Sequence, residues 1–85
     1  MSIHVIIETA SKAEAQLIAD ELPMRAEAEF WRGFGVIRLA AKSKGETKQL
    51  IEVVSRSFRE HGLKWARVRY DDEERVFKAN GHQAA

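Results

Sequence analysis

The stretch Trp31-Arg32-Gly33-Phe34-Gly35-Val36-Ile37-Arg38-Leu39 decides how this chain folds. Its two glycines favour a tight hairpin turn near residues 32–35, because glycine adopts positive φ without steric cost. The segment before the turn, Met24 to Trp31, alternates small or apolar residues with polar ones, which is the period of a half-buried strand. An apolar run, Val36 to Ala41, follows the turn. The stretch therefore predicts two antiparallel strands in the middle of the chain.

Two capping boxes flank this hairpin and mark the starts of two helices. Ser11-Lys12-Ala13-Glu14 follows the β-branched run His4 to Glu8, and Ser43-Lys44-Gly45-Glu46 follows the apolar run after the hairpin. In such a box the serine side chain accepts a hydrogen bond from the glutamate amide, while the glutamate side chain reaches back to the start of the helix. The repeated device predicts two strand-helix units related by weak internal symmetry.

The ends of these helices are also marked in the sequence. Pro23 cannot continue a helix, so the first helix should end near Glu21 or Leu22. Gly62 supplies a stop for the second helix directly after His61, which is expected to complement the carboxy-terminal end of that helix.

The remaining elements complete a βαββαβ order. Leu63 to Tyr70 reads as a fourth strand, Asp71 to Glu74 as a solvated turn, and Arg75 to Lys78 as a possible short fifth strand. This order predicts an α+β, two-layer, ferredoxin-like sandwich, with an antiparallel sheet of order 4-1-3-2 and both helices on one face. Residues 1–79 are expected to form a single domain and residues 80–85 a disordered tail.

Composition limits the classes of function. The chain has 85 residues with 14 Lys and Arg against 13 Asp and Glu, a net charge of +1, so binding driven by charge alone is not expected. The absence of cysteine excludes disulfides, thiolate metal sites and a cysteine nucleophile, and it favours a cytoplasmic location. No apolar run approaches the roughly 18 residues of a membrane span, so no membrane association is expected.

Strand alternation predicts which side chains lie on the helix-free face of the sheet. Arg38 should not be buried, which places Phe34 and Val36 on the open face and Ile37 in the core. In the second strand Phe30 is expected to face the core. The predicted open face comprises His4, Ile6, Glu8, Arg25, Glu27, Glu29, Trp31, Phe34, Val36, Arg38, Ala40, Trp65, Arg67 and Arg69.

Aromatic and arginine side chains gather on this predicted face. A contiguous apolar patch on a solvated surface marks an interface, and Trp with Arg is the composition of binding hot spots. The sequence therefore predicts a non-catalytic module that binds a protein partner, including a second copy of itself as a homodimer. The alternative is that the tryptophans only cover the edges of the core, or that the carboxy-terminal segment folds over the sheet. The expected partner-binding residues are Trp31, Phe34, Val36, Arg38, Trp65, Arg67 and Arg69.

The segment Arg32 to Leu39 resembles the third-strand signature of the RNA-recognition-motif family. Its first four residues match the pattern of a basic residue, glycine, an aromatic residue and a small residue, whereas Val36 and Leu39 replace aromatic residues of the family. The resemblance implies single-stranded RNA binding, in which aromatic rings stack on bases and arginines contact phosphates. The implied RNA-binding residues are His4, Arg32, Phe34 and Arg38.

Motifs for catalysis are not found. His4, His61 and His82 have no spacing that would form a metal site, and there is no phosphate-binding glycine loop, so neither a metal nor another cofactor is expected. No catalytic residue is assigned. A third interpretation is a dimeric domain that senses a small ligand between two copies.

Overall fold

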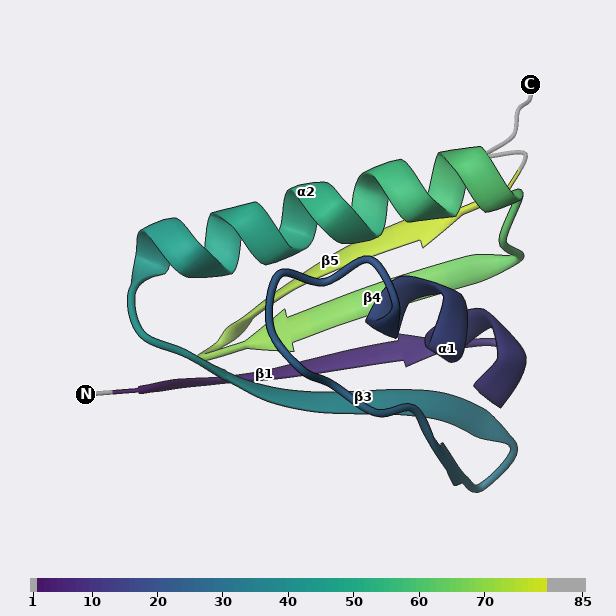
Figure 1. Cartoon of the computed structure of the whole chain (residues 1–85), viewed down its shortest axis with the longest axis horizontal. Coiled ribbons are helices and arrows are strands. Elements are labelled where there is room, and N and C mark those ends of the chain that lie inside the picture. Colours follow the sequence, from purple (N-terminus) through teal and green to yellow (C-terminus); the bar gives the residue numbers. More distant parts are fainter. Residues whose placement is uncertain (1, 80–85) are drawn as a thin grey trace.

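Five strands and two helices make up the chain in the computed structural model, which describes residues 2–79 (Figure 1). The elements are β1 (Ile3–Thr9), α1 (Lys12–Ala19), β2 (Glu29–Trp31), β3 (Phe34–Ala41), α2 (Lys44–His61), β4 (Trp65–Tyr70) and β5 (Glu73–Lys78). The predicted class, an α+β fold with an antiparallel sheet and two helices, is confirmed. The predicted tail, residues 80–85, lies outside the described residues.

All five strands join one antiparallel sheet in the order β2-β3-β1-β4-β5. The predicted order, 4-1-3-2 with four strands, is wrong, because the sheet has five strands. Read from its other edge the sheet runs 5-4-1-3-2, because Glu73–Lys78 forms a full strand that pairs with the entire length of β4. The turn before β5 is correspondingly shorter than predicted and leaves only Asp71 and Asp72 unpaired between the two strands. As a result β1 is the central strand of the sheet.

Both predicted serine caps are present, and one of the two glutamates reaches back to the start of its helix as predicted: Glu46 Oε1 accepts from the amide of Lys42 at 2.7 Å. The side chains of Ser11 and Ser43 accept from the amides of Glu14 and Glu46 at 3.2 and 3.1 Å. The Glu14 carboxylate, however, accepts from the amide of Lys64 at 3.1 Å, so it ties the start of α1 to the entry of β4. The contact between Glu14 and Lys64 thus connects elements that are far apart in the sequence.

The segment between α1 and β2 does not extend the sheet as predicted. Helix α1 already ends at Ala19, and the next amides tighten the turn: Glu21 and Leu22 donate to the carbonyls three residues back at 3.0 and 3.3 Å. The chain then crosses the helix side of the sheet (Figure 1), where Leu22 and Ala28 are buried in the core. Because this segment fills the space beside the short α1, only Glu29–Trp31 remains to pair with β3.

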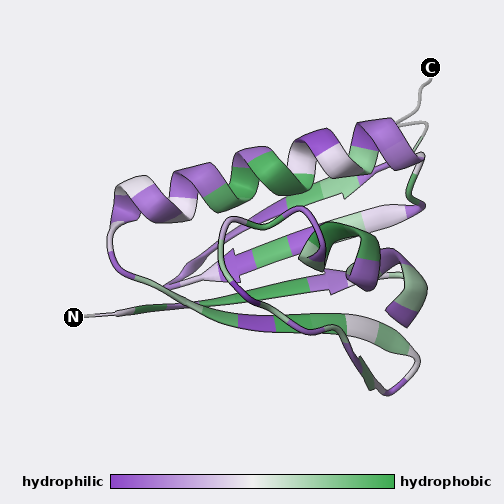
Figure 2. Cartoon of the chain, in the orientation of Figure 1, coloured by the Kyte–Doolittle hydropathy of each residue, from purple (hydrophilic) through white to green (hydrophobic). Residues whose placement is uncertain are grey.

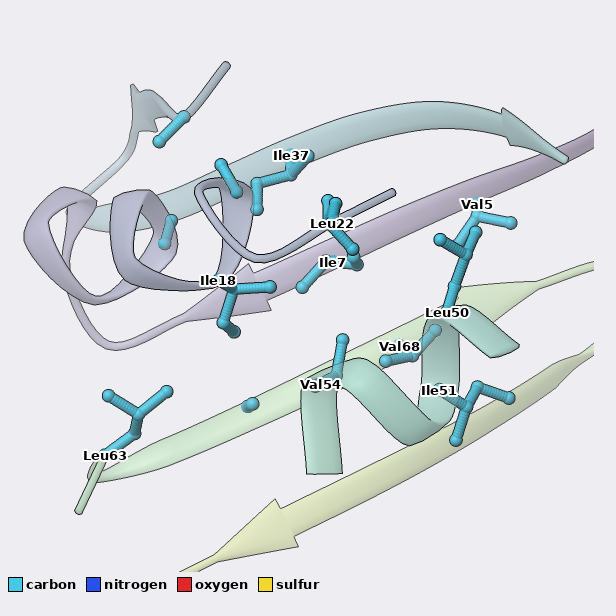
Figure 3. Close-up of a cluster of buried hydrophobic side chains, with 14 of the residues drawn as sticks. Val5, Ile7, Ile18, Leu22, Ile37, Leu50, Ile51, Val54, Leu63 and Val68 are labelled. Carbon is cyan, nitrogen blue, oxygen red and sulfur yellow. The ribbon is translucent and has the colours of Figure 1, made fainter. Parts of the chain in front are cut away.

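The core lies between the helices and one face of the sheet (Figure 3). Side chains of β1, α1 and α2 meet there, with Val5, Ile18, Leu50 and Val54 fully buried. Figure 2 shows hydrophobic residues in the middle of α2 and along β1 and β3, which is the pattern that this packing requires. Ile37, which strand alternation predicted for the core, is fully buried there.

The two glycines of the hairpin segment have different roles. Gly33 has φ of 88° and follows Arg32 with φ of 51°, as a two-residue hairpin turn requires. Gly35 instead lies beneath the loop that enters α1: a Cβ added to it would stand 2.0 Å from the carbonyl oxygen of Ser11. The prediction that the turn explains both glycines is thus wrong for Gly35, which permits close approach of two backbones.

Candidate binding surface on the open face of the sheet

No helix among residues 2–79 covers the second face of the sheet, which we call the open face. Cross-strand pairing assigns its residues, since partners lie on the same face: Glu8 pairs with Val36 and with Arg67, and Arg67 pairs with Val76. The alternation predicted for β1, β3 and β4 is confirmed by these pairs. The open face comprises His4, Ile6, Glu8, Glu29, Trp31, Phe34, Val36, Arg38, Ala40, Trp65, Arg67, Arg69, Glu74, Val76 and Lys78.

An apolar band crosses one end of the open face and consists of Trp31, Phe34, Trp65 and Val76. Trp31 and Phe34 are direct cross-strand partners at the hairpin. Phe34 and Trp65 meet edge to face, with ring centroids 5.6 Å apart and an interplanar angle of 81°. They can meet because β1, which separates β3 from β4, ends at Thr9. Trp31 is 46% exposed and Val76 is 45% exposed, so the band presents large apolar groups to solvent.

A shallow depression lies beside the band and is lined by Phe34, Trp65, Arg67, Val76 and Lys78. Two aromatic rings and a valine form its apolar walls, and two cationic side chains border it. The Arg67 guanidinium lies 6.0 Å from the centroid of the Trp65 ring, where a cation is attracted by the ring face. The depression can therefore receive an aromatic or aliphatic side chain.

The centre of the open face holds an ion-pair network around Glu8. This glutamate is only 6% exposed, yet its Oε1 accepts from Arg67 Nε at 2.6 Å and lies 2.6 Å from Nη2. Its Oε2 lies 3.7 Å from Nη1 of Arg69. A carboxylate so far from water needs such partners, because leaving it unpaired would cost its desolvation energy. Both arginines predicted from β4 thus have a carboxylate partner within the chain.

Arg38 and Val36, which were also predicted to bind a partner, differ in their exposure. Arg38 donates from Nη1 to Glu29 Oε1 at 2.7 Å across the β2–β3 pair, in an exposed ion pair. Val36 lies on the open face as predicted but is only 2% exposed, so the expectation that it presents surface to a partner is wrong. It lies between Glu29 and Glu8 in the sheet, and the neighbouring side chains cover it.

Phe30 corrects the prediction for β2. It was expected in the core but is 67% exposed, more than Trp31 beside it. The reason is that β2 forms the sheet edge and projects beyond the two helices (Figure 1), so no element covers its core-side face there. Both aromatic residues of this short strand therefore face solvent, on opposite sides of the sheet.

The structure brings together only part of the predicted RNA-binding set. Arg32 lies next to the band, with its guanidinium 4.7 Å from the Trp31 ring centroid. His4 is on the open face but pairs with Ala40, which stands six positions from Phe34 along β3, or roughly 20 Å away. His4 and Phe34 therefore cannot stack on adjacent bases.

A second polar cluster lies outside the open face and joins the end of α1 to α2. Glu21 accepts from the hydroxyl of buried Ser57 at 2.5 Å, and its other oxygen lies 2.8 Å from His61 Nε2. The hydrogen bond from Ser57, and then that with His61, lowers the pKa of the Glu21 carboxyl. His61 thus pairs with a glutamate of another element, beyond the predicted role at its own helix end.

Two residues of the depression escaped sequence reasoning. Val76 and Lys78 belong to β5, which the sequence indicated only as a possible short strand. The signal that could have placed them is the alternation in Glu73–Lys78, where Val76 and Phe77 fall on opposite faces. The residues described here contain no group of three His, Asp or Glu side chains arranged to hold a metal ion.

Among residues 2–79, neither helix has both the length and the apolar composition of a membrane span.

Comparisons with known proteins give no assignment. No family model, no curated protein and no solved structure shows a significant match to this chain.

Proposed function

We propose that this chain is a non-catalytic binding module whose open face docks an apolar surface of a protein. The observation that carries the proposal is the apolar band, in which Trp31 and Val76 are nearly half exposed and flank the Phe34–Trp65 pair. Burial of aromatic side chains at the centre of a contact supplies most of the binding free energy in protein interfaces. Trp31, Phe34 and Trp65 would anchor the partner.

The arginines of the open face favour a protein over a polyanion. Arg38 and Arg67 already donate to Glu29 and Glu8 at 2.7 and 2.6 Å, and Arg69 lies near the second Glu8 oxygen. A phosphate backbone would have to displace these carboxylates before it gained the same contacts. An apolar protein surface can instead cover the band while the ion pairs stay intact and orient it.

Single-stranded RNA is the second candidate, favoured by one observation. Arg32 lies over the Trp31 ring at 4.7 Å, beside Phe34, so a stacking surface and a cation stand next to each other. Bases stack on such rings with little sequence preference, and binding of this kind weakens with salt.

Site-specific photo-crosslinking in cells would test the proposal. A benzophenone amino acid placed at Val76 reports contacts of the band, and the same group at Leu17 of α1 is the control, because Leu17 is also an exposed apolar residue (38%) but lies in the helix layer. Protein adducts are expected from position 76 and to fall when Phe34→Ala is added.

Two results would overturn the protein assignment. Equal adduct yields at positions 76 and 17 would mean that proteins do not bind the open face in preference to the helix layer. Adducts at position 76 that nuclease removes and protease does not would assign the face to nucleic acid.

A further inference from the structure

We propose that the protein docked on the open face is a second copy of this chain, in a face-to-face dimer whose two-fold axis runs along β1. This inference rests on the proposed function and adds to it the partner and the arrangement. It is drawn from the symmetry of the sheet, the charges of the open face and the area that the face offers.

The sheet order makes such an arrangement self-complementary. β1 is the middle strand of β2-β3-β1-β4-β5, so a two-fold axis along β1 brings β2 of one copy over β5 of the other, and β3 over β4. Two stacked sheets with nearly aligned strands are a standard packing, with about 10 Å between them.

This symmetry places a projecting side chain over the depression twice. Trp31 on β2 lies level with Phe34, Trp65 and Lys78 along the strands, since these residues are linked by cross-strand pairing and by the edge-to-face contact of the two rings. Trp31 of one copy therefore faces the depression beside Lys78 and Val76 of the other copy, and the reverse contact forms at the same time. The Phe34–Trp65 pairs of the two copies face each other between these contacts.

The charges of the open face are compatible with a partner of the same kind. The axis places Arg38 of one copy over Arg69 of the other, and Glu8 over Glu8, but each of these groups already has an opposite charge beside it in its own chain: Arg38 pairs with Glu29, and Glu8 with Arg67 and Arg69. Lys78 has no ion-pair partner among residues 2–79, and the symmetry brings Glu29 of the second copy close to it. At the axis, Ile6 of one copy meets Ile6 of the other.

The area of the open face is that of a small interface, of the kind that holds weak dimers together. The four longer strands, six to eight residues long and about 4.8 Å apart, give a face of roughly 450 Å² before side-chain relief is added. A standard interface buries about 800 Å² per partner, about a tenth of a small protein's surface, and this chain exposes 5546 Å² in total.

Sedimentation equilibrium over a range of concentrations would test the dimer with a matched pair of variants. Trp31→Ala is expected to weaken association about tenfold or more, because it empties both depressions. Phe30→Ala is the control: it removes the adjacent and more exposed aromatic residue from the other side of the sheet and should leave the association constant unchanged. Thermal melts of both variants at low concentration would verify that the monomers stay folded.

Mixing two impaired variants gives a sharper result. Val76→Glu places a charge in the depression but keeps Trp31. Trp31→Ala removes the inserted side chain but keeps the depression intact. A one-to-one mixture should associate more tightly than either variant alone, because the mixed dimer regains one complete Trp31 contact.

Three outcomes would overturn the inference: a wild-type monomer at all concentrations, equal weakening by Phe30→Ala and Trp31→Ala, or no gain on mixing. Crosslinks from position 76 to a different protein, together with a monomeric chain, would overturn the dimer alone and leave the proposed binding function standing. If position 76 gave no more adducts than position 17, both the dimer and the proposed binding function would be overturned.

Discussion

Gly35 stands where the fold leaves no space for a side chain. A Cβ there would lie 2.0 Å from the Ser11 carbonyl oxygen and 2.6 Å from Thr9 Oγ1, and the first of these atoms belongs to backbone that cannot swing aside. We expect Gly35→Ala to lower the free energy of unfolding by about 2–4 kcal/mol, since β3 or the loop before α1 must shift. Urea titration followed by circular dichroism measures this loss.

Gly45→Ala is the matched control for that prediction. In the first turn of α2 the added Cβ would meet only Ser43 Oγ at 3.7 Å, an ordinary contact. Alanine is a better helix former than glycine, so this variant should gain about 0.5–1 kcal/mol. A Gly35→Ala protein as stable as wild type would show that the close approach of the two backbones imposes no constraint.

At the scale of single residues, the sequence predicted the face of a side chain better than its depth. Arg38 correctly fixed the orientation of β3, and alternation then placed Phe34 and Arg67 on the open face. Alternation carries no information on what lies above a residue, so Val36 and Phe30, at 2% and 67% exposure, were both misjudged. Their exposure depends on neighbouring strands and on the reach of the helices, which are tertiary properties.

At the scale of elements, Ser57, Glu21 and His61 hold the end of α1 against α2. The hydrogen bond from Ser57 is the largest cause of the lowered pKa of Glu21. A carboxyl whose pKa is lower in the folded than in the unfolded chain stabilises the fold at pH values above its unfolded pKa. This contribution is lost as the pH falls through its pKa in the folded chain.

This relation predicts how Ser57→Ala responds to pH. The variant should be less stable than wild type at neutral pH. The difference should shrink as the pH falls from the ordinary carboxyl value of 4.5 through the lowered pKa of Glu21 in the folded protein. Urea unfolding of both proteins at several pH values between about 3 and 7 measures the difference. A difference that stays constant over this range would contradict an ionised Glu21 as the acceptor.

The starts of elements were easier to predict than their lengths. Ser11 and Ser43 identified both helix starts because capping depends on a few local residues. The segment before Glu29 has strand-like alternation, yet its small alanines serve equally well to pack beside α1. As a result β2 is five residues shorter than the predicted strand from Met24 to Trp31. β5 was underestimated because its pairing with β4 covers the full strand, including residues assigned to the turn.

At the scale of the whole molecule, association through the open face would appear as stability that depends on concentration. Binding of a folded partner stabilises the native state by mass action. For a chain of this size a hundredfold rise in protein concentration should raise the Tm by roughly 5 °C. Differential scanning calorimetry of wild type and Trp31→Ala checks this prediction: the variant should lose most of the concentration dependence, and an equal dependence in both would contradict it.

The path of the chain from Asp20 to Ala28 has one more consequence, which concerns the backbone of β3. Because β2 pairs only with residues 34–36, the outer edge of β3 from Ile37 to Ala41 has no backbone hydrogen bond to another strand or loop among residues 2–79. Amides that point to this edge should exchange their hydrogen with solvent far faster than the alternate amides that donate to β1. A strand with buried side chains would thus show protection at every second residue only.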